Sequence, residues 1–264
     1  VNNVSTDASP ADNYKVFANI KENLDFLKSK YNALICSDII IREFNMFVYN
    51  ENHKCFIIYI DGLVDSLSIN DFILEPLMLG KFRYNKPFDG ALSDYIYNCL
   101  LPQNSVTSVK NYSDVFSGIN MGDCLLFIDT LEIAFDIDVK KYEHRNISVP
   151  VNESAIKGPQ EGFVENIRTN TSLIRRIVNN ENLVIETIPI GKISKIKCSV
   201  CYLQNIANGY LVSEIKYRLN NLAVDSLLST GELEQLIEDD GGFGIPHVLS
   251  TERPDKCAKY LFQG

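Results

Sequence analysis

Two spacings of apolar residues recur along the first half of the chain. Apolar residues three or four apart predict helices, and short apolar or alternating runs predict strands. Helices are expected at 14–30, 68–79, 92–101 and 112–119, and strands at 39–49, 55–60, 106–110, 124–129 and 131–139. Some successive strands are joined by short turns and others by helices. This order predicts an α/β subdomain with a mixed sheet flanked by helices.

Local signals refine three of these elements. Asp12 or Asn13 can cap the first helix, since both side chains accept hydrogen bonds from free backbone amides. Residues 50–53 separate two strand-like runs, which predicts a hairpin turn. Phe56–Ile60 is apolar at every position, which is typical of a central strand.

The second half opens with a strongly helical pattern over 162–179. Strands are expected next at 183–189 and 196–203, and helices at 210–221, 231–238 and 254–262. Pro254 suits the first position of the last helix, and Asp255 suits its first turn. A second α/β subdomain follows from this order, again a mixed sheet flanked by helices.

A loss of periodicity divides the chain. Residues 1–12 are expected to be disordered, 13–139 to form the first subdomain, 140–157 to be a linker and 158–264 to form the second subdomain. The linker is polar, and Gly158-Pro159 supplies a rigid turn at its end. It is also the expected hinge between the subdomains.

Charge and hydropathy narrow the possible partners. The net charge of −9 argues against nucleic acid and against docking on anionic lipid, because both need a basic surface. No run of about 18 apolar residues is present and the N-terminus carries no signal pattern, so we expect a soluble, unprocessed chain. The seven cysteines are odd in number and scattered, which favours free thiols in a reducing compartment.

The residue types that carry catalysis do not cluster. The three histidines, His53, His144 and His247, lie far apart in sequence, so no metal site is expected. Cys198 and Cys201 form a CxxC inside a predicted strand, where positions three apart face opposite sides. The glycine-rich stretch 241–244 is not followed by the lysine that a phosphate-binding loop requires. The acidic residues 238–240 are expected to lie in a solvent-exposed loop. We therefore predict no catalytic residue, no cofactor and no enzymatic activity.

The helix predicted over 162–179 carries the candidate binding residues. Its charged positions could form a solvated amphipathic face, or could hold an anionic ligand group or an acidic partner surface. The residues assigned to a subunit or ligand contact are Glu161, Glu165, Arg168, Arg175, Arg176 and, before the last helix, Arg253.

Three long segments resemble the GerA family of spore germination proteins. The stretch GPQEGFVENIRTNTSLIRR at 158–176 is similar to the family pattern GPxEGFxENxxTNxxLIRRR. The stretch PHVLSTERPDKCAKYLFQG at 246–264 resembles PQVLSTERPDKVAxxLxEG, with His247 in place of Gln. Val200–Glu238 matches in type and spacing, and Tyr59–Gly62 is the matching piece of the first half. Ile177 stands where the first pattern ends in Arg.

The resemblance implies a place in a germinant receptor. This region would be the soluble N-terminal part of the A subunit, followed by a membrane domain and working with B and C subunits. The complex would lie in the spore inner membrane, with this region on the cytosolic side, and would respond to amino acids, sugars or nucleosides. The region would transduce the nutrient signal; an alternative is a module that binds a small molecule in a cleft between the subdomains.

Overall fold

The apolar patterns fold around two separate sheets in the computed structural model, which describes residues 14–48, 51–79, 90–141, 158–238 and 248–264. The chain divides into two compact units, one made of 1–33 and 38–142 and the other of 34–37 and 143–264. Four residues from the first half of the sequence thus belong to the second unit. The expected disordered segment 1–12, the linker from residue 142 onward and the loop acids 239–240 and glycines 241–244 lie outside the described residues.

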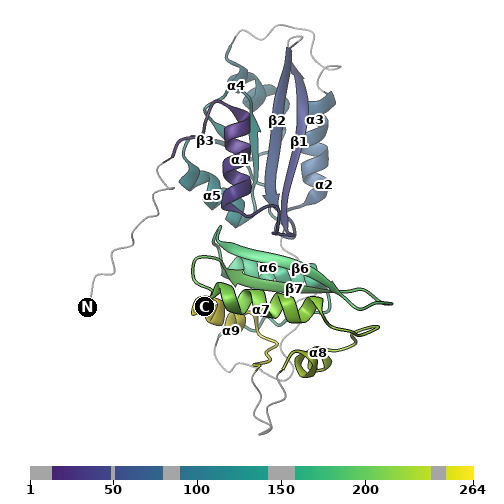
Figure 1. The fold of residues 1–264 in the computed structure, drawn as a ribbon. Helices are drawn as coiled ribbons and strands as arrows, with labels where there is room; N and C mark the ends of the chain where they lie inside the picture. Colours follow the sequence, from purple (N-terminus) through teal and green to yellow (C-terminus); the bar gives the residue numbers. More distant parts are fainter. Residues whose placement is uncertain (1–13, 49–50, 80–89, 142–157, 239–247) are drawn as a thin grey trace, which may run out of the picture. The chain divides into compact units, whose positions relative to one another are not determined.

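A five-stranded sheet forms the first unit (Figure 1). In spatial order its strands are β1 (Ile39–Val48), β2 (Glu51–Ile60), β4 (Cys124–Ile128), β5 (Ala134–Ile137) and β3 (Val106–Val109). The α/β class is confirmed. The predicted mixture of strand directions is not found, because every described pair is antiparallel. The helical crossover after β2 leads to the edge strand β3, and the crossover through α5 leads from β3 to the central strand β4, so neither crossover joins strands that pair with each other.

Helices cover both faces of this sheet. α1 (Ile20–Lys30) and α5 (Tyr112–Met121) lie on one face, where their aromatic side chains pack tightly, with 4.4 Å between the ring centroids of Phe26 and Tyr112. The helices whose buried side chains pack with the opposite face are α2 (Ser66–Ile69), the π-helical η2 (Asn70–Leu74), α3 (Glu75–Leu79), α4 (Leu92–Tyr95) and the π-helical η4 (Ile96–Leu100). The two layers of helices bury the central strands from both sides.

The central position of β2 is confirmed. Phe56, Ile57 and Ile58 are fully buried, and Phe56 stacks on Phe127 of β4 at 4.7 Å between ring centroids. Complete burial of such side chains stabilises a sheet by roughly 1.5–3 kcal/mol per residue, which explains the apolar run.

Two boundaries differ from the sequence prediction. α1 starts at Ile20 and is capped by Asn19, not by Asp12 or Asn13. The residues just before α1 are not helical and bind to the strand region instead. Val16 N donates to Lys110 O at 2.8 Å, which holds this stretch beside the sheet. The prediction of a turn at 50–53 is wrong for Glu51–His53, which pair with β1, and residues 49–50 lie outside the described residues.

A two-stranded antiparallel sheet organises the second unit. Its elements are α6 (Ile167–Ile177), β6 (Leu183–Ile190), β7 (Ile196–Leu203), α7 (Gly209–Asn220), α8 (Thr230–Ile237) and α9 (Pro254–Leu261). α7 packs against β6, and α6 and α9 pack against β7 and against each other. Among the residues described in either unit, no helix is both long enough and apolar enough to cross a bilayer.

Candidate functional site

The two segments that carry the strongest family patterns meet in the second unit. Phe163 N donates a hydrogen bond of 2.8 Å to Glu252 O, and α6 packs against α9. We call residues 158–177 together with 250–261 the signature region. Sequence positions about 90 residues apart therefore form one continuous structure.

Two asparagines shape the start of α6. Asn166 accepts hydrogen bonds from Arg168 N at 2.9 Å and Thr169 N at 3.4 Å, as an N-cap does. Asn170 donates to Val164 O at 2.6 Å and accepts from Val164 N at 2.8 Å, which holds the preceding loop against the helix. The helix therefore begins at Ile167, and its predicted start at 162 is wrong. Asn166 was the signal for the true start.

The structure distributes the predicted contact residues over several environments. Glu165, just before the N-cap of α6, and Arg168, on the first turn of α6, are both exposed. Glu161 and Arg176 are partly exposed and form an ion pair at 3.4 Å. Gly158 and Pro159 are exposed, and Gly158 has a φ of +131°, which a side chain would strain.

Arg253 is ordered by an acidic neighbour. Its Nε and Nη2 donate to the two carboxylate oxygens of Asp255 at 3.0 and 2.6 Å, in a bidentate pair. The guanidinium holds the pKa of Asp255 below its ordinary value. Pro254 begins α9 as predicted, so the pair fixes the entry to this helix.

Arg175 is buried rather than exposed. Only 2% of it is accessible, so it cannot belong to an exposed docking face of this unit, and its assignment to such a face is corrected. Its Nη2 instead donates to Cys36 Sγ at 3.1 Å. A buried guanidinium requires polar partners, because burying a charge without them is costly.

Cys36 belongs to a short strap, Leu34–Ser37, that the second unit takes from the first half of the sequence. Ile185 N donates to Cys36 Sγ at 3.3 Å, and Ser37 N donates to Ile185 O at 2.8 Å. The Ser37 hydroxyl lies 2.9 Å from that of Thr187. The strap therefore lines the free edge of β6. The sequence predicted free thiols, and Cys36 is a free, buried cysteine, but its role as a hydrogen-bond acceptor was missed.

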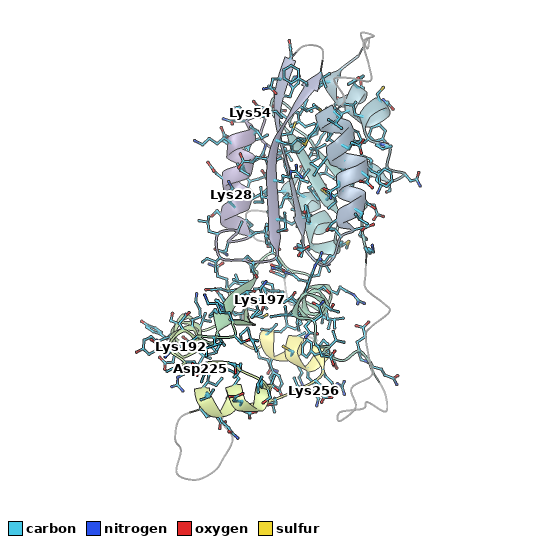
Figure 2. The ribbon with its side chains drawn as sticks, turned by 90° about the vertical axis from the view of Figure 1, so that its right-hand side faces the viewer. Lys28, Lys54, Lys192, Lys197, Asp225 and Lys256 are labelled. Atoms are coloured by element: carbon cyan, nitrogen blue, oxygen red, sulfur yellow. The ribbon has the colours of Figure 1, made fainter. Side chains whose placement is uncertain are left out.

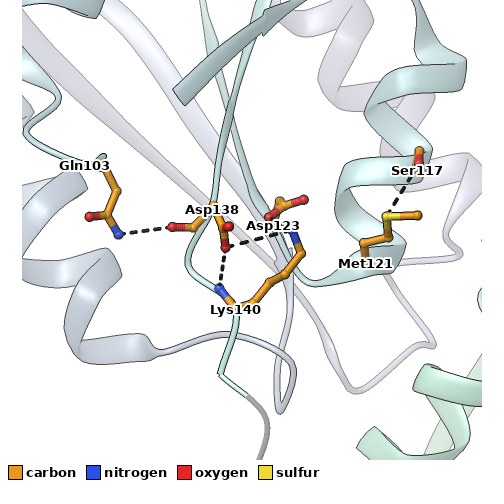
Figure 3. Close-up of polar contacts among 6 residues, drawn as sticks. All are labelled: Gln103, Ser117, Met121, Asp123, Asp138 and Lys140. Carbon is orange, nitrogen blue, oxygen red and sulfur yellow. Dashed lines mark hydrogen bonds and ion pairs between the residues drawn. The ribbon is translucent and has the colours of Figure 1, made fainter. Parts of the chain in front are cut away.

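A second polar cluster lies in the first unit (Figure 3). Lys140 Nζ donates to Asp123 Oδ1 at 2.5 Å and lies 3.9 Å from Asp138 Oδ1. Burial and the nearby charge of Asp123 raise the pKa of Asp136 to about 6. No group of three or more acidic, cysteine or histidine side chains within the described ranges is arranged to hold a metal ion. With Lys140 among these carboxylates, the cluster fastens the end of the first unit, where Val64 and Lys140 form a β-bridge.

The sequence profile described as "Bacillus/Clostridium GerA spore germination protein" matches residues 25–264. The chain belongs to the GerA family. Its resemblance to that family, seen in the signature region, is therefore confirmed.

Curated GerA relatives cover most of this chain. Spore germination protein KA of Bacillus subtilis (strain 168) is 33% identical over 86% of this chain and 41% of the relative. Spore germination protein B1 of the same organism is 32% identical over 95% and 50%, and Uncharacterized membrane protein YfkQ is 32% identical over 93% and 46%. The chain thus spans half or less of the length of these relatives.

A solved structure of a spore germinant receptor domain has the same fold. The N-terminal domain of the A subunit of the Bacillus megaterium spore germinant receptor GerK3 matches with a TM-score of 0.66 and 30% identity. The match covers 95% of this chain and 90% of that domain.

We predict that Arg175→Ala destabilises the second unit by about 2–4 kcal/mol, since it removes a buried side chain and the hydrogen bond to Cys36. Urea unfolding measures the loss, and hydrogen exchange should show faster exchange of the Ser37 amide. Arg176→Ala is the matched control on the next residue, where a partly exposed ion pair is worth only about 0–1 kcal/mol. Equal destabilisation by the two variants would contradict the strap's dependence on Arg175.

We predict that the first unit becomes more stable as the pH falls from 7 to about 5. The pKa of Asp136 is higher in the folded state than in the unfolded state, so the folded state binds the proton more tightly. Protonation of Asp136 therefore stabilises the first unit; this stabilisation is complete at low pH and is lost as the pH rises through about 6. Asp123 shifts in the same direction. Asp136→Asn should raise the Tm at pH 7 and flatten its pH dependence, while Asp25→Asn on exposed α1 should change neither. An unchanged pH profile in Asp136→Asn would refute this assignment.

Proposed function

We propose that this chain is the N-terminal domain of a germinant receptor A subunit and that it transduces a nutrient signal during spore germination. The observation that carries the proposal is the match to the GerK3 A-subunit domain, which covers 90% of that domain. The relatives named as spore germination proteins support the same process.

The proposed receptor context follows from the relatives. Their length leaves room for further domains, and one of them is named a membrane protein. We place the chain in a complex with B and C subunits at the spore inner membrane, with this domain on the cytosolic side. The role proposed is non-enzymatic, because the groups with shifted pKa values in the first unit are explained by burial and by the ion pair with Lys140.

The proposed mechanism is conformational. The chain passes between the two units at both ends of the strap and again through residues 142–157, so a change in one unit has covalent routes to the other. A ligand or subunit that prefers one arrangement would bias the rest of the receptor by a coupling free energy of about 1–3 kcal/mol. The exposed Glu165 and Arg168 of the signature region are the proposed contact for a neighbouring subunit.

A second candidate function is the binding of a small molecule. The second unit contains an apolar groove of about 400 Å³ between β7, α7 and α9, whose walls include Tyr202, Leu211 and Leu261. Such a groove suits an apolar or amphipathic molecule. Calorimetric titration of the chain with amino acids, sugars and nucleosides tests this, and Leu211→Arg should abolish any heat that arises in the groove.

We predict that Arg168→Glu in the full-length protein slows germination severalfold, because it reverses the charge of the proposed contact. The Tm of the isolated chain should stay within about 2 °C, since exposed substitutions change stability by less than about 0.5 kcal/mol. Lys21→Glu on α1 provides a charge-reversal control at an exposed position. Spores with normal receptor levels and unchanged germination kinetics in Arg168→Glu would rule out this contact.

A further inference from the structure

The turn between β6 and β7 has an unusual composition for this acidic chain. Residues 191–197 contain Lys192, Lys195 and Lys197 and no acidic residue. Ile193 is 81% exposed and Ile196 is 37% exposed. We call residues 191–197 the hairpin tip. The hairpin tip joins β6 to β7 at the end of the two-stranded sheet (Figure 1).

Backbone hydrogen bonds fix the hairpin tip in shape. Lys192 N donates to Val224 O at 3.0 Å, and Ile193 N and Ser194 N both donate to Asp225 O, at 2.9 and 3.0 Å. Gly191 has a φ of +105°, and a Cβ there would lie 2.2 Å from Ser194 O, so only glycine fits. Ile193 is therefore held outward by a rigid turn rather than exposed by a loose one.

Charges near the tip are predominantly positive. Figure 2 labels Lys192, Lys197 and Asp225 in the second unit, the aspartate lying on the loop that holds the tip. Three lysines against this one aspartate leave a local charge of about +2. The tip thus differs in sign from the chain as a whole, whose net charge is −9.

We propose that the hairpin tip docks on the anionic surface of a phospholipid membrane. Lysines beside a membrane bind acidic headgroups, and an exposed isoleucine gains free energy by entering the boundary between headgroups and acyl chains. A lipid boundary accepts one protruding apolar side chain without a shaped pocket, which suits this convex turn. The inference rests on the proposed function, in which the domain belongs to a membrane receptor.

The net charge does not oppose this docking at physiological ionic strength. Electrostatic interactions between exposed charges are screened beyond about 8 Å at 0.15 M salt. Lysines that touch the headgroups are within this distance, and Asp225, whose backbone carbonyl holds the tip, is the acidic residue counted against them. The expectation that anionic lipid is excluded came from the net charge, which is an average over a surface whose local charge varies.

Because the 264-residue chain has no tryptophan, Ile193→Trp introduces a single fluorescent reporter at the tip. With vesicles of equal parts phosphatidylglycerol and phosphatidylcholine, its emission should shift to the blue and be quenched by brominated lipid. Leu67→Trp is the matched control, since Leu67 is 67% exposed on α2 of the first unit. Its emission should not change. Equal shifts of the two reporters, or no shift of either, would overturn the proposal.

Charge is tested separately by replacing Lys192, Lys195 and Lys197 with Gln in the otherwise unchanged chain. Co-sedimentation with the same vesicles should fall about fivefold for each lysine removed, while the Tm stays constant. Undiminished sedimentation, or equal binding to pure phosphatidylcholine, would refute the electrostatic part and with it the proposal. A blue shift of Ile193→Trp produced by inorganic phosphate or polyglutamate alone would reassign the tip to an anion or an acidic peptide.

These vesicle experiments are independent of germination. If the chain binds anionic vesicles but Arg168→Glu spores germinate normally, the contact proposed for Arg168 fails and the membrane inference stands. If the chain does not bind vesicles while Arg168→Glu impairs germination, the membrane inference fails and the contact proposed for Arg168 stands.

Discussion

The second unit depends on one buried cation. Arg175 lies inside the unit with almost no exposed surface, and its guanidinium binds the sulfur of Cys36. A charge in such a place needs hydrogen-bond acceptors, and the strap supplies one of them, the sulfur of Cys36. The strap in turn supplies backbone and hydroxyl hydrogen bonds to Ile185 and Thr187. The sulfur of Cys36 accepts hydrogen bonds from both α6 and β6 and so joins these two elements to the strap.

This arrangement divides the arginines of α6 into two roles. Arg175 holds the interior together, whereas Arg168 is exposed, and Arg176 pairs with Glu161 at the surface. Only the exposed positions are available for contact with another protein. The sequence motif suggests one charged helix face, but it combines a buried structural arginine with arginines on the surface. The effect of a substitution would therefore have a different physical cause at each of these positions.

Much of the fold could be predicted from the sequence. β2 was recognised as central because its apolar run admits no exposed face, and Pro254 marked the start of α9 through its fixed φ. The strap could not be predicted, because four residues carry no periodicity and their partners lie about 140 residues away. Strand direction was also missed, since helical connections allow either sense. Within the candidate site, Glu165 and Arg168 are exposed, whereas burial of Arg175 depends on tertiary contacts that helical spacing does not report.

The route of the strap limits how this protein can be divided. A fragment that begins at residue 143 contains every helix and strand of the second unit but lacks the sulfur that Arg175 binds. Its β6 edge would be open to pairing with other chains, a common origin of aggregation. During synthesis the strap leaves the ribosome long before β6 and must wait for its partner. The chain folds into two compact units, yet neither unit is encoded by one uninterrupted stretch of sequence.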